Sequence, residues 1–162
     1  MLKLDLYDKK YAKQILSWSD NSRDFYKWTA GVLGDYPISE EQFNQVMKHR
    51  AFVCLNGDDI VGFFTLRKPD NSVDEFRIGF VIIAPDKRRL GFGKKMLKLG
   101  TEYAFHNLGV KRLSLAVFEN NEAAYYCYKS VGFSDVTSDD VEIYQVLGEE
   151  WKCRELELQT DY

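Results

Sequence analysis

The segment from Val81 to Lys94 reads V-I-I-A-P-D-K-R-R-L-G-F-G-K, and it constrains the fold of this chain more than any other stretch. It begins as an apolar strand that breaks at Pro85, passes three basic residues and reaches two glycines, Gly91 and Gly93. Glycines at such a place let the backbone approach a ligand closely, and the amides at the start of a following helix can then point at an anion. The segment therefore predicts a strand, a phosphate-binding loop and a helix in succession.

Two common nucleotide-binding loops are excluded by single residues. The GxxxxGK[ST] loop requires Ser or Thr after its lysine, but Lys94 is followed by Lys95, and Arg88 stands where the first glycine belongs. The dinucleotide fingerprint requires a third glycine where this chain has Met96. Neither an NTPase loop nor a Rossmann loop therefore accounts for the segment.

A second motif follows the first at some distance along the chain. The loop fits R-x-x-G-x-G from Arg88 to Gly93, and the stretch from Asn121 to Phe133 fits N-x-x-A-x-x-x-Y-x-x-x-G-F at every fixed position. Two ordered motifs, with a helix and a strand between them, arise by chance far less often than one. Together they resemble the acetyl-CoA pyrophosphate loop and the motif helix of the GNAT superfamily of N-acetyltransferases. The amino-terminal part additionally looks like the branch that includes ribosomal-protein amino-terminal, aminoglycoside and polyamine acetyltransferases.

Length and composition indicate the broad class. The chain has 162 residues, of which 45% are hydrophobic, so we expect a single domain over residues 1–162, which the resemblance implies is an N-acetyltransferase domain. No run approaches the roughly 20 apolar residues of a membrane span, and the amino terminus alternates in charge, so we expect a soluble, cytoplasmic protein with no membrane partner. Three cysteines without a CxxC pair and two distant histidines, His49 and His106, argue against a disulfide framework and a metal site.

The charge is acidic overall and basic in one place. A net charge of −3 argues against a nucleic-acid partner, whose binding would require many neutralised phosphates. The segment from Asp86 to Lys98 nevertheless contains six basic residues. A solvated helix face is one explanation for such a run. Its place beside the glycine loop instead favours the pyrophosphate and 3′-phosphate of CoA, the ligand that the resemblance implies.

The apolar periodicity and the turn residues predict the order of elements. We expect strands at 2–6, 51–55, 60–67, 73–83 and 111–118, and a final hairpin at 140–147 and 151–158. We expect helices after Asp8, over 40–48, after the glycine loop and from 122 to Gly132. An aromatic loop or short helix is expected near 25–37. This order is typical of a mixed α/β sheet with a helix on each face. The resemblance implies the GNAT fold, a central, mostly antiparallel sheet with a splayed parallel strand pair and helices on both faces.

The resemblance implies an acetyl-CoA site beside the splayed strands. Acetyl-CoA would be a cosubstrate, with its pantetheine arm along the open edge of the strand at 73–83 and its pyrophosphate on the loop. The binding residues so implied are Val81, Ile83, Arg88, Arg89, Leu90, Gly91, Phe92, Gly93, Lys94 and Asn121. Val81 and Ile83 would act through their backbone while they pack in the core, and Asn121 either caps the motif helix or contacts CoA.

Tyr128 is the catalytic residue that the resemblance indicates. It matches the tyrosine whose hydroxyl lies near the CoA sulfur and acts as general acid, whereas core packing is the alternative reading of the same residue. Family members often carry Glu in a phrase like E-I-G-Y, but this chain reads Arg77-Ile-Gly-Phe80. Glu75 lies on the same face as Arg77 and is a candidate base or a salt-bridge partner of that arginine, the salt bridge being the simpler reading.

The remaining roles are open at the level of sequence. The base is alternatively an ordered water, a carboxylate of the acidic tail, or unnecessary if the amine arrives neutral; the acidic-tail candidates are Asp139, Asp140, Glu142, Glu149 and Glu150. The acceptor is a primary amine of a small molecule or peptide, in a pocket that we expect Trp28, Tyr36 and the last hairpin to line. Acids in that pocket would favour a cationic amine, although solvated turns explain them nearly as well.

The expected reaction is direct attack in a ternary complex, because Cys127 reads as a core residue and not as a nucleophile. A non-catalytic acyl-CoA sensor or interaction module on the same fold is the alternative from another functional class. The oligomeric state is open, with a homodimer among the alternatives.

Overall fold

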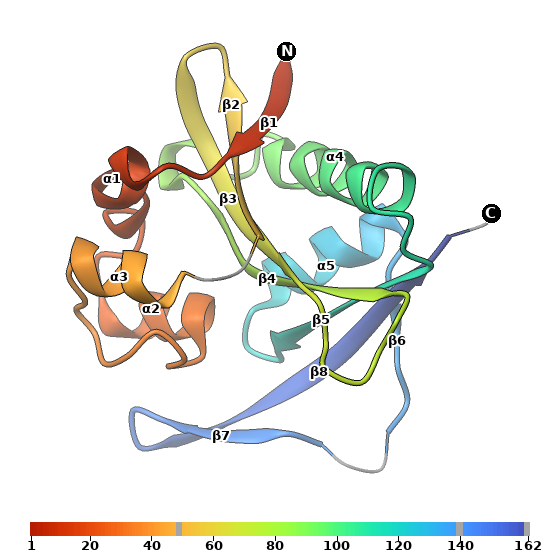
Figure 1. The fold of residues 1–162 in the computed structure, drawn as a ribbon. Coiled ribbons are helices and arrows are strands. Elements are labelled where there is room, and N and C mark those ends of the chain that lie inside the picture. The colour runs from red at the N-terminus through yellow and green to blue at the C-terminus, as the bar shows by residue number, and fades with distance from the viewer. Residues whose placement is uncertain (48–49, 139–140, 161–162) are drawn as a thin grey trace.

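A strongly twisted sheet forms the centre of the structure, a computed structural model that describes residues 1–47, 50–138 and 141–160 (Figure 1). Its strands are β1 (Leu2–Leu6), β2 (Arg50–Asn56), β3 (Asp59–Arg67), β4 (Glu75–Ile83), β5 (Arg112–Phe118), β6 (Ser134–Asp135), β7 (Ile143–Val146) and β8 (Glu149–Gln159). The order across the sheet is β1-β2-β3-β4-β5-β8-β6, and β7 pairs with β8. Only β4 and β5 are parallel among these pairs. The predicted mixed, mostly antiparallel sheet is confirmed.

The parallel pair separates after three residues. β4 and β5 are paired only from Glu75 opposite Arg112 to Arg77 opposite Ser114. Beyond that point β5 stays paired with β8, while β4 stays paired with β3 through a shift of register. The shift coincides with Phe80, whose φ of 51° lies in the left-handed region that residues other than glycine rarely adopt. A bulge of this kind bends a strand, and here it directs β4 away from β5.

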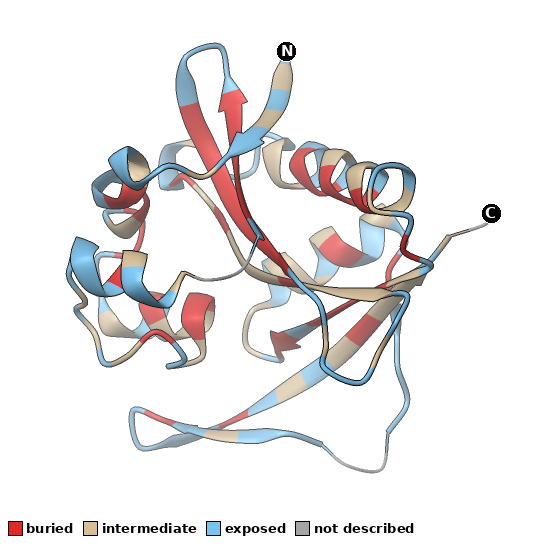
Figure 2. Ribbon diagram, in the orientation of Figure 1, coloured by how far each residue is buried: buried red, intermediate tan, exposed pale blue. Residues whose placement is uncertain are grey.

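Helices cover both faces of the sheet, as predicted. They are α1 (Ala12–Leu16), α2 (Ser22–Thr29), α3 (Glu40–Val46), α4 (Phe92–His106) and α5 (Glu122–Val131), with short 3₁₀ turns η1 (Lys9–Tyr11) and η2 (Pro85–Lys87). Figure 1 shows α1, α2 and α3 on one side and α4 and α5 on the other. Along β2, Phe52 and Cys54 pack in the cluster with α4, and Val53 and Leu55 pack in the cluster with α1 to α3. The strands between the helices are therefore the most buried part of the chain (Figure 2).

The amino-terminal helices begin at side-chain caps. Asp8 caps η1, and Ser39 with Gln42 forms the predicted capping box of α3. Asn21 accepts a hydrogen bond from the amide of Asp24 and so starts α2, which begins before the predicted aromatic loop or short helix near 25–37 and extends into it. α3 ends at Val46, and the last residue of the predicted range, position 48, lies outside the described residues.

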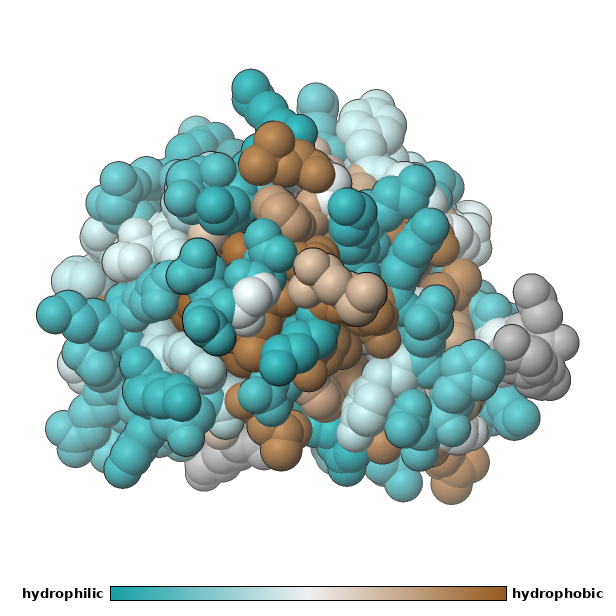
Figure 3. Space-filling view, turned by 90° about the horizontal axis from the view of Figure 1, so that it is seen from above, coloured by the Kyte–Doolittle hydropathy of each residue, from teal (hydrophilic) through white to brown (hydrophobic). Residues whose placement is uncertain are grey.

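The predicted strands are present, and their ends differ from the predicted ones by at most three residues. The hairpin of β7 and β8 lies below α2 in Figure 1 and packs against it through Tyr26 and Trp151, while position 140 of its predicted range lies outside the described residues. β6 was not predicted, because two residues are too few to show a period. Seen from above, the surface is mostly hydrophilic, with apolar side chains gathered near its centre (Figure 3). Within the described ranges, none of the helices has the length and apolar character that crossing a bilayer requires.

Candidate active site

The loop that carries Arg88, Arg89 and Gly91 leads into the amino terminus of α4, where the first backbone amides have no partner in the helix. Pro85 opens η2, and Gly91, with φ of 84°, stands at the N-cap of α4 without a side-chain hydrogen bond to the helix. The amide of Lys95 donates to the carbonyl of Gly91 at 3.1 Å. The amides before Lys95 are those that an α-helix leaves free at its start. Free amides next to arginine and lysine side chains are a suitable site for phosphate groups.

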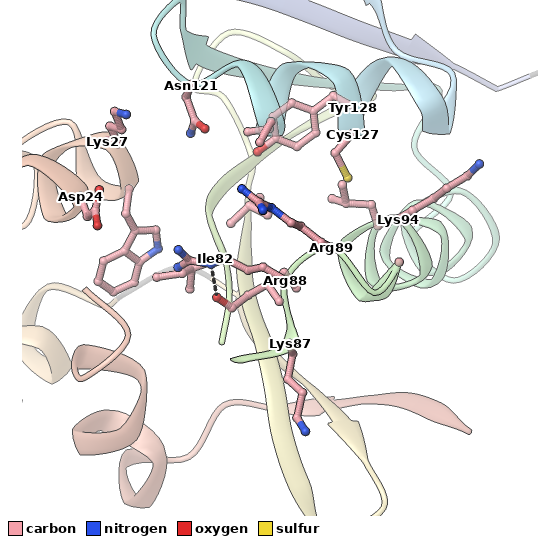
Figure 4. A pocket seen from close by; sticks show the side chains of 18 of the residues that line it. Asp24, Lys27, Ile82, Lys87, Arg88, Arg89, Lys94, Asn121, Cys127 and Tyr128 are labelled. Atoms are coloured by element: carbon pink, nitrogen blue, oxygen red, sulfur yellow. Dashed lines mark hydrogen bonds between the residues drawn. The ribbon is translucent and has the colours of Figure 1, made fainter. Parts of the chain in front are cut away.

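A cavity of about 610 Å³, here called the loop cavity, lies between this loop, β4 and α5 (Figure 4). Nine of the predicted site residues line it, namely Val81, Ile83, Arg88, Arg89, Gly91, Gly93, Lys94, Asn121 and Tyr128. Leu90 and Phe92 do not: the side chain of Leu90 is exposed, and Phe92 packs against the core. Any contribution of these two residues to ligand binding would come from their backbone amides.

The elements around the loop cavity approach one another closely at Gly93. A Cβ atom at this position would lie 3.4 Å from Sγ of Cys127 on α5 and 3.6 Å from Cγ1 of Ile83 on β4. Nε of Arg88 donates to the carbonyl oxygen of Ile83 at 3.0 Å, so this side chain lies across the end of β4. Figure 4 shows the guanidinium groups of Arg88 and Arg89 inside the cavity, whose lining also includes Lys87.

A second cavity, of about 330 Å³ and here called the arginine cavity, lies beside the first. Its wall includes Arg67 on β3, Arg77 on β4 and Tyr144 on β7. The two cavities share five residues, Lys27, Trp28, Val81, Asn121 and Tyr128. A molecule in one cavity can therefore meet a molecule in the other beside Tyr128. Among the described residues, no three His, Cys, Asp or Glu side chains gather in a way that could hold a metal ion.

Tyr128 is a buried residue that lines both cavities. Only 6% of the residue is exposed, and its ring packs edge-on against Phe133 with the centroids 6.1 Å apart. It nevertheless lines both cavities, and its hydroxyl points to the side where Asn121 lies (Figure 4). Burial, with a smaller contribution from Cys127, raises the pKa of this phenol above its ordinary value. Tyr128 is thus a proton donor throughout the neutral range of pH.

Asn121 is placed to contact a ligand. It occupies the N-cap of α5, but its side chain makes no capping hydrogen bond. Its backbone carbonyl oxygen accepts a hydrogen bond from the backbone amide of Tyr125. The side chain lines both cavities. Of the two roles expected from the sequence, contact with a ligand is the one that this geometry permits.

Glu75 is held by other partners than the sequence suggested. Its carboxylate accepts from Arg112 at 2.6 Å and from the hydroxyl of Ser114, and it lines neither cavity. Burial by itself would raise the pKa of Glu75, but the hydrogen bonds from Ser114 and Arg112 and the charges of Arg112 and Arg77 outweigh it and hold the pKa below its ordinary value. Arg77 forms two hydrogen bonds with Glu155 instead. The expected direct Glu75–Arg77 bridge is therefore replaced by a Glu75–Arg112 pair and an Arg77–Glu155 pair, which Ser114 links by accepting from Arg77 and donating to Glu75.

One hydrogen bond joins α2 to β4 in the part of the lining that the two cavities share. Trp28 is buried, lines both cavities and donates from its indole Nε1 to the carbonyl oxygen of Phe80 at 2.8 Å. Phe80 is the residue of positive φ in the β4 bulge. Tyr36, which the sequence placed in the same pocket, packs on Phe25 and lies outside both linings.

The sequence left two explanations for the tail acids, a lining of the acceptor pocket and solvated turns, and the described part of the chain does not show the first. Neither Asp nor Glu appears among the described residues that line the arginine cavity. Glu149 pairs with Arg23 at 2.8 Å and accepts from the indole of Trp151, while Glu150 lies near the side chain of Gln145. Asp139 and Asp140 lie outside the described residues.

Several lining residues were not singled out from the sequence. Asp24 and Lys27 on α2 line the loop cavity, and Arg67 lies at the end of β3. The Asn21-x-x-Asp24 cap was the available signal for α2. In a helix that begins there, residues 24, 27 and 28 lie on one face, because they are three and four positions apart.

Known proteins show the same arrangement of elements. Residues 12–133 match a family model described as "Acetyltransferase (GNAT) family". A solved structure of spermidine N-acetyltransferase from Vibrio cholerae, in complex with CoA and spermine, matches 98% of this chain and 95% of its own with a TM-score of 0.81 at 18% identity. A GNAT-family acetyltransferase from Bacillus anthracis matches 98% of this chain and 94% of its own, with a TM-score of 0.77 at 16% identity. At such identities the two structures demonstrate a common fold.

Proposed function

Because this chain belongs to the GNAT acetyltransferase family, we propose that it moves an acetyl group from acetyl-CoA to a primary amine of a small molecule or peptide. The observation that carries this proposal is the meeting of two cavities at Tyr128. One cavity would hold the acetyl donor and the other the amine, so that both substrates are present together in a ternary complex. Holding two reactants in this way is a large part of the catalysis of group transfer.

The loop cavity has the features that a CoA site needs. The amides at the start of α4 and the side chains of Arg88, Arg89 and Lys94 are suited to the pyrophosphate. The backbone of β4 beyond Arg77 has no partner strand in β5, so Val81 and Ile83 can offer their peptide groups to the pantetheine arm. Arg88 would have to release the carbonyl of Ile83, to which it donates in this structure. The CoA in the Vibrio cholerae structure supports this assignment for the fold.

The proposed reaction consists of one displacement. The amine nitrogen attacks the thioester carbonyl carbon, a C–N bond forms, the C–S bond breaks, and the sulfur leaves as the CoA thiol. Tyr128 would donate a proton to the departing sulfur and regain one from solvent, while the nitrogen loses its extra proton to solvent. The raised pKa of Tyr128 keeps the phenol protonated until it is needed.

Two side chains that could suggest other mechanisms are unsuited to them. Burial raises the pKa of Cys127, which keeps this thiol protonated and a weak nucleophile. This supports direct transfer without an acetyl-enzyme. Glu75, the base candidate from the sequence, is already bonded to Arg112 and Ser114 and lies outside both cavities. We therefore propose that the amine enters unprotonated, without a carboxylate base from the described residues of the arginine cavity.

We further propose that the 162 residues form a single acetyltransferase domain and that the protein works in the cytoplasm. The spermine bound in the Vibrio cholerae protein supports a small-molecule amine as acceptor for this fold. Both cavities are formed within one copy of the chain, so the proposed reaction does not require a second copy. The proposal therefore holds equally for a monomer and for a homodimer.

Calorimetric titration with acetyl-CoA tests the donor site. Gly93→Glu places a carboxylate among Cys127, Ile83 and the α4 amides, and we expect binding to be lost. Gly93→Ala is the matched control, because its Cβ would meet those neighbours at ordinary contact distances and binding should persist. Equal binding by both variants would contradict the donor site.

Release of the CoA thiol from acetyl-CoA in the presence of a panel of primary amines tests the transfer itself. We expect turnover with at least one amine and a product heavier by one acetyl group. Binding of acetyl-CoA without turnover on any amine would instead indicate a non-catalytic acyl-CoA sensor on the same fold.

A further inference from the structure

The titratable side chains of the arginine cavity are cationic or neutral. Lys27, Arg67 and Arg77 carry positive charge, while the other titratable groups in the lining are the phenols of Tyr128 and Tyr144 and the thiol of Cys153. No carboxylate joins them among the described residues of the lining. The cavity that would receive the amine is therefore positive in the described part of the chain.

Two of the cations are directly opposite each other. Arg67 on β3 and Arg77 on β4 are cross-strand partners, and both side chains line the cavity. Like charges in such a pair repel each other. A sheet that keeps two arginines opposite each other beside a cavity is thus stabilised by an anion bound between them or by carboxylates of its own.

Carboxylates of the protein lie beside Arg77, whereas Arg67 has no carboxylate within ion-pair distance among the described residues. Glu155 forms two hydrogen bonds with Arg77, and Glu75 and Glu142 also favour its charged form. For Arg67 and Lys27, the described residues include no ion-pair partner within 4.0 Å. Arg67, which is exposed to solvent, and Lys27 are therefore the cations of the cavity without an ion-pair partner among the described residues.

From these charges we infer that the acceptor is a small primary amine that also carries an anionic group, such as a carboxylate or a phosphate, and that Arg67 and Lys27 bind this group. This inference rests on the proposed function and names its substrate class. An arginine guanidinium offers a paired set of donors to a carboxylate or phosphate. A polyamine would bring further positive charge to a cavity whose described lining has no carboxylate to receive it. The volume of about 330 Å³ suits a small molecule.

The same charges assist the reaction. Neighbouring cations lower the pKa of an ammonium group and thereby favour its neutral form, which is the form that attacks. An anionic group held at Arg67 also fixes the orientation of the amine relative to Tyr128. The cavity would thus select the acceptor and prepare its nitrogen with the same side chains.

A competition experiment with matched amines tests the inference. The wild-type protein and acetyl-CoA are incubated with equal amounts of the common α-amino acids, their neutral α-amides, phosphoethanolamine, ethanolamine and spermidine, and the acetylated products are measured by mass spectrometry. We expect an anionic amine to be preferred at least about tenfold over its neutral counterpart and over spermidine. A preference for neutral amines or spermidine would overturn the inference and leave the proposed function intact.

Two charge reversals separate Arg67 from the general charge of the protein. Arg67→Glu should abolish or reverse the preference while acetyl-CoA binding is retained. Lys68→Glu is the matched control, because it makes the same change at the next exposed residue, which lines neither cavity. An equal loss of preference in both variants would show that the bulk charge, and not Arg67, is responsible.

A binding measurement decides the case in which no amine is acetylated. Saturation-transfer NMR of the same mixture, with CoA present, reports which amines contact the protein. Contact confined to the anionic amines and lost in Arg67→Glu would support the inference even if the proposed transfer fails. Contact that does not distinguish anionic from neutral amines would overturn it.

Discussion

The hydroxyl group of Tyr128 can be removed while the ring is kept, which separates the two roles of this residue. Its ring is buried against Phe133, and the residue lines both cavities. We expect Tyr128→Phe to lower turnover by about ten- to ten-thousand-fold, since general acid catalysis contributes factors of this order. Acetyl-CoA affinity should be nearly unchanged, because the packing remains. Steady-state kinetics and calorimetric titration check the two expectations.

A purely structural Tyr128 would give a different result. Loss of one hydroxyl would then cost about 1 kcal/mol of unfolding free energy, and the rate at saturating substrate would hardly change. A variant that folds, binds and turns over like the parent would reduce Tyr128 to a core residue.

Glu75 illustrates a charged residue whose contacts favour structure over catalysis. Its pKa is lowered although burial opposes this, because Ser114 and Arg112 donate to the carboxylate. Such a group stabilises the fold above its unfolded pKa of about 4.5, and this contribution is lost as the pH falls through the lower, folded value. We expect Glu75→Gln to cost about 1 kcal/mol at pH 7, since Arg112 is partly exposed to solvent. Urea unfolding should show the difference from wild type shrinking below about pH 4.

Turnover distinguishes this reading of Glu75 from the role of a base. The Gln variant should keep its rate and its pH optimum, because the residue lines neither cavity. A collapse in rate with a displaced pH optimum would instead restore Glu75 as the base.

At the scale of elements, α2 and β4 are joined by the hydrogen bond from Trp28 to the carbonyl of Phe80. We expect Trp28→Phe to lower the unfolding free energy by about 1–3 kcal/mol, because a carbonyl in the bulge loses its partner. The apparent KM for the amine should rise more than kcat falls, since this wall shapes the space where the substrates meet. Chemical denaturation and two-substrate kinetics measure the two effects.

Trp18→Phe is the matched comparison for this contact. Trp18 is buried in the same cluster as Trp28. Within the residues described, no hydrogen bond is assigned to its indole, so the substitution removes similar volume without removing a donor. If Trp18→Phe raised the KM for the amine as much as Trp28→Phe does, general loosening of the cluster would explain both variants.

At the scale of the whole molecule, burial of weak acids predicts a loss of stability at alkaline pH. Burial raises the pKa of Cys54 and Cys153 from 9.0 to about 11 and, with the nearby acids Asp8 and Glu40, that of Tyr7 from 10.0 to about 12. Between the unfolded and folded values, the unfolded chain loses protons that the folded chain keeps. These groups therefore stabilise the fold fully below about pH 9, and their contribution falls as the pH rises through 9 to 12.

Thermal unfolding at pH 8, 9, 10 and 11 measures this dependence. We expect the midpoint temperature to fall steadily over that range, and Cys153→Ala to make the fall shallower between pH 9 and 11. A midpoint that stays constant or rises would contradict the expected sign.

Local patterns in the sequence account for much of the fold. The capping box at Ser39, the hairpin between β2 and β3 and the glycine that ends α5 each depend on a few neighbouring residues, and each lies where it was predicted. The same holds for the loop before α4, because Pro85, Gly91 and Gly93 act through their own backbone geometry. The motifs around Tyr128 likewise identified the family, since the spacing of a motif is a property of the chain itself.

The partners of charged side chains were decided only by the tertiary structure. Glu75 bonds with Arg112 and Ser114, and Arg77 with Glu155, from strands that lie 37 to 78 residues away along the chain. Spacing predicted a Glu75–Arg77 bridge, because the two residues share a face of one strand, but it carried no information on what β5 and β8 bring beside them. The positive acceptor cavity arises in the same way. Arg67 and Arg77 become neighbours only when β3 and β4 pair in this register, and Lys27 joins them only when α2 packs on the bulge at Phe80.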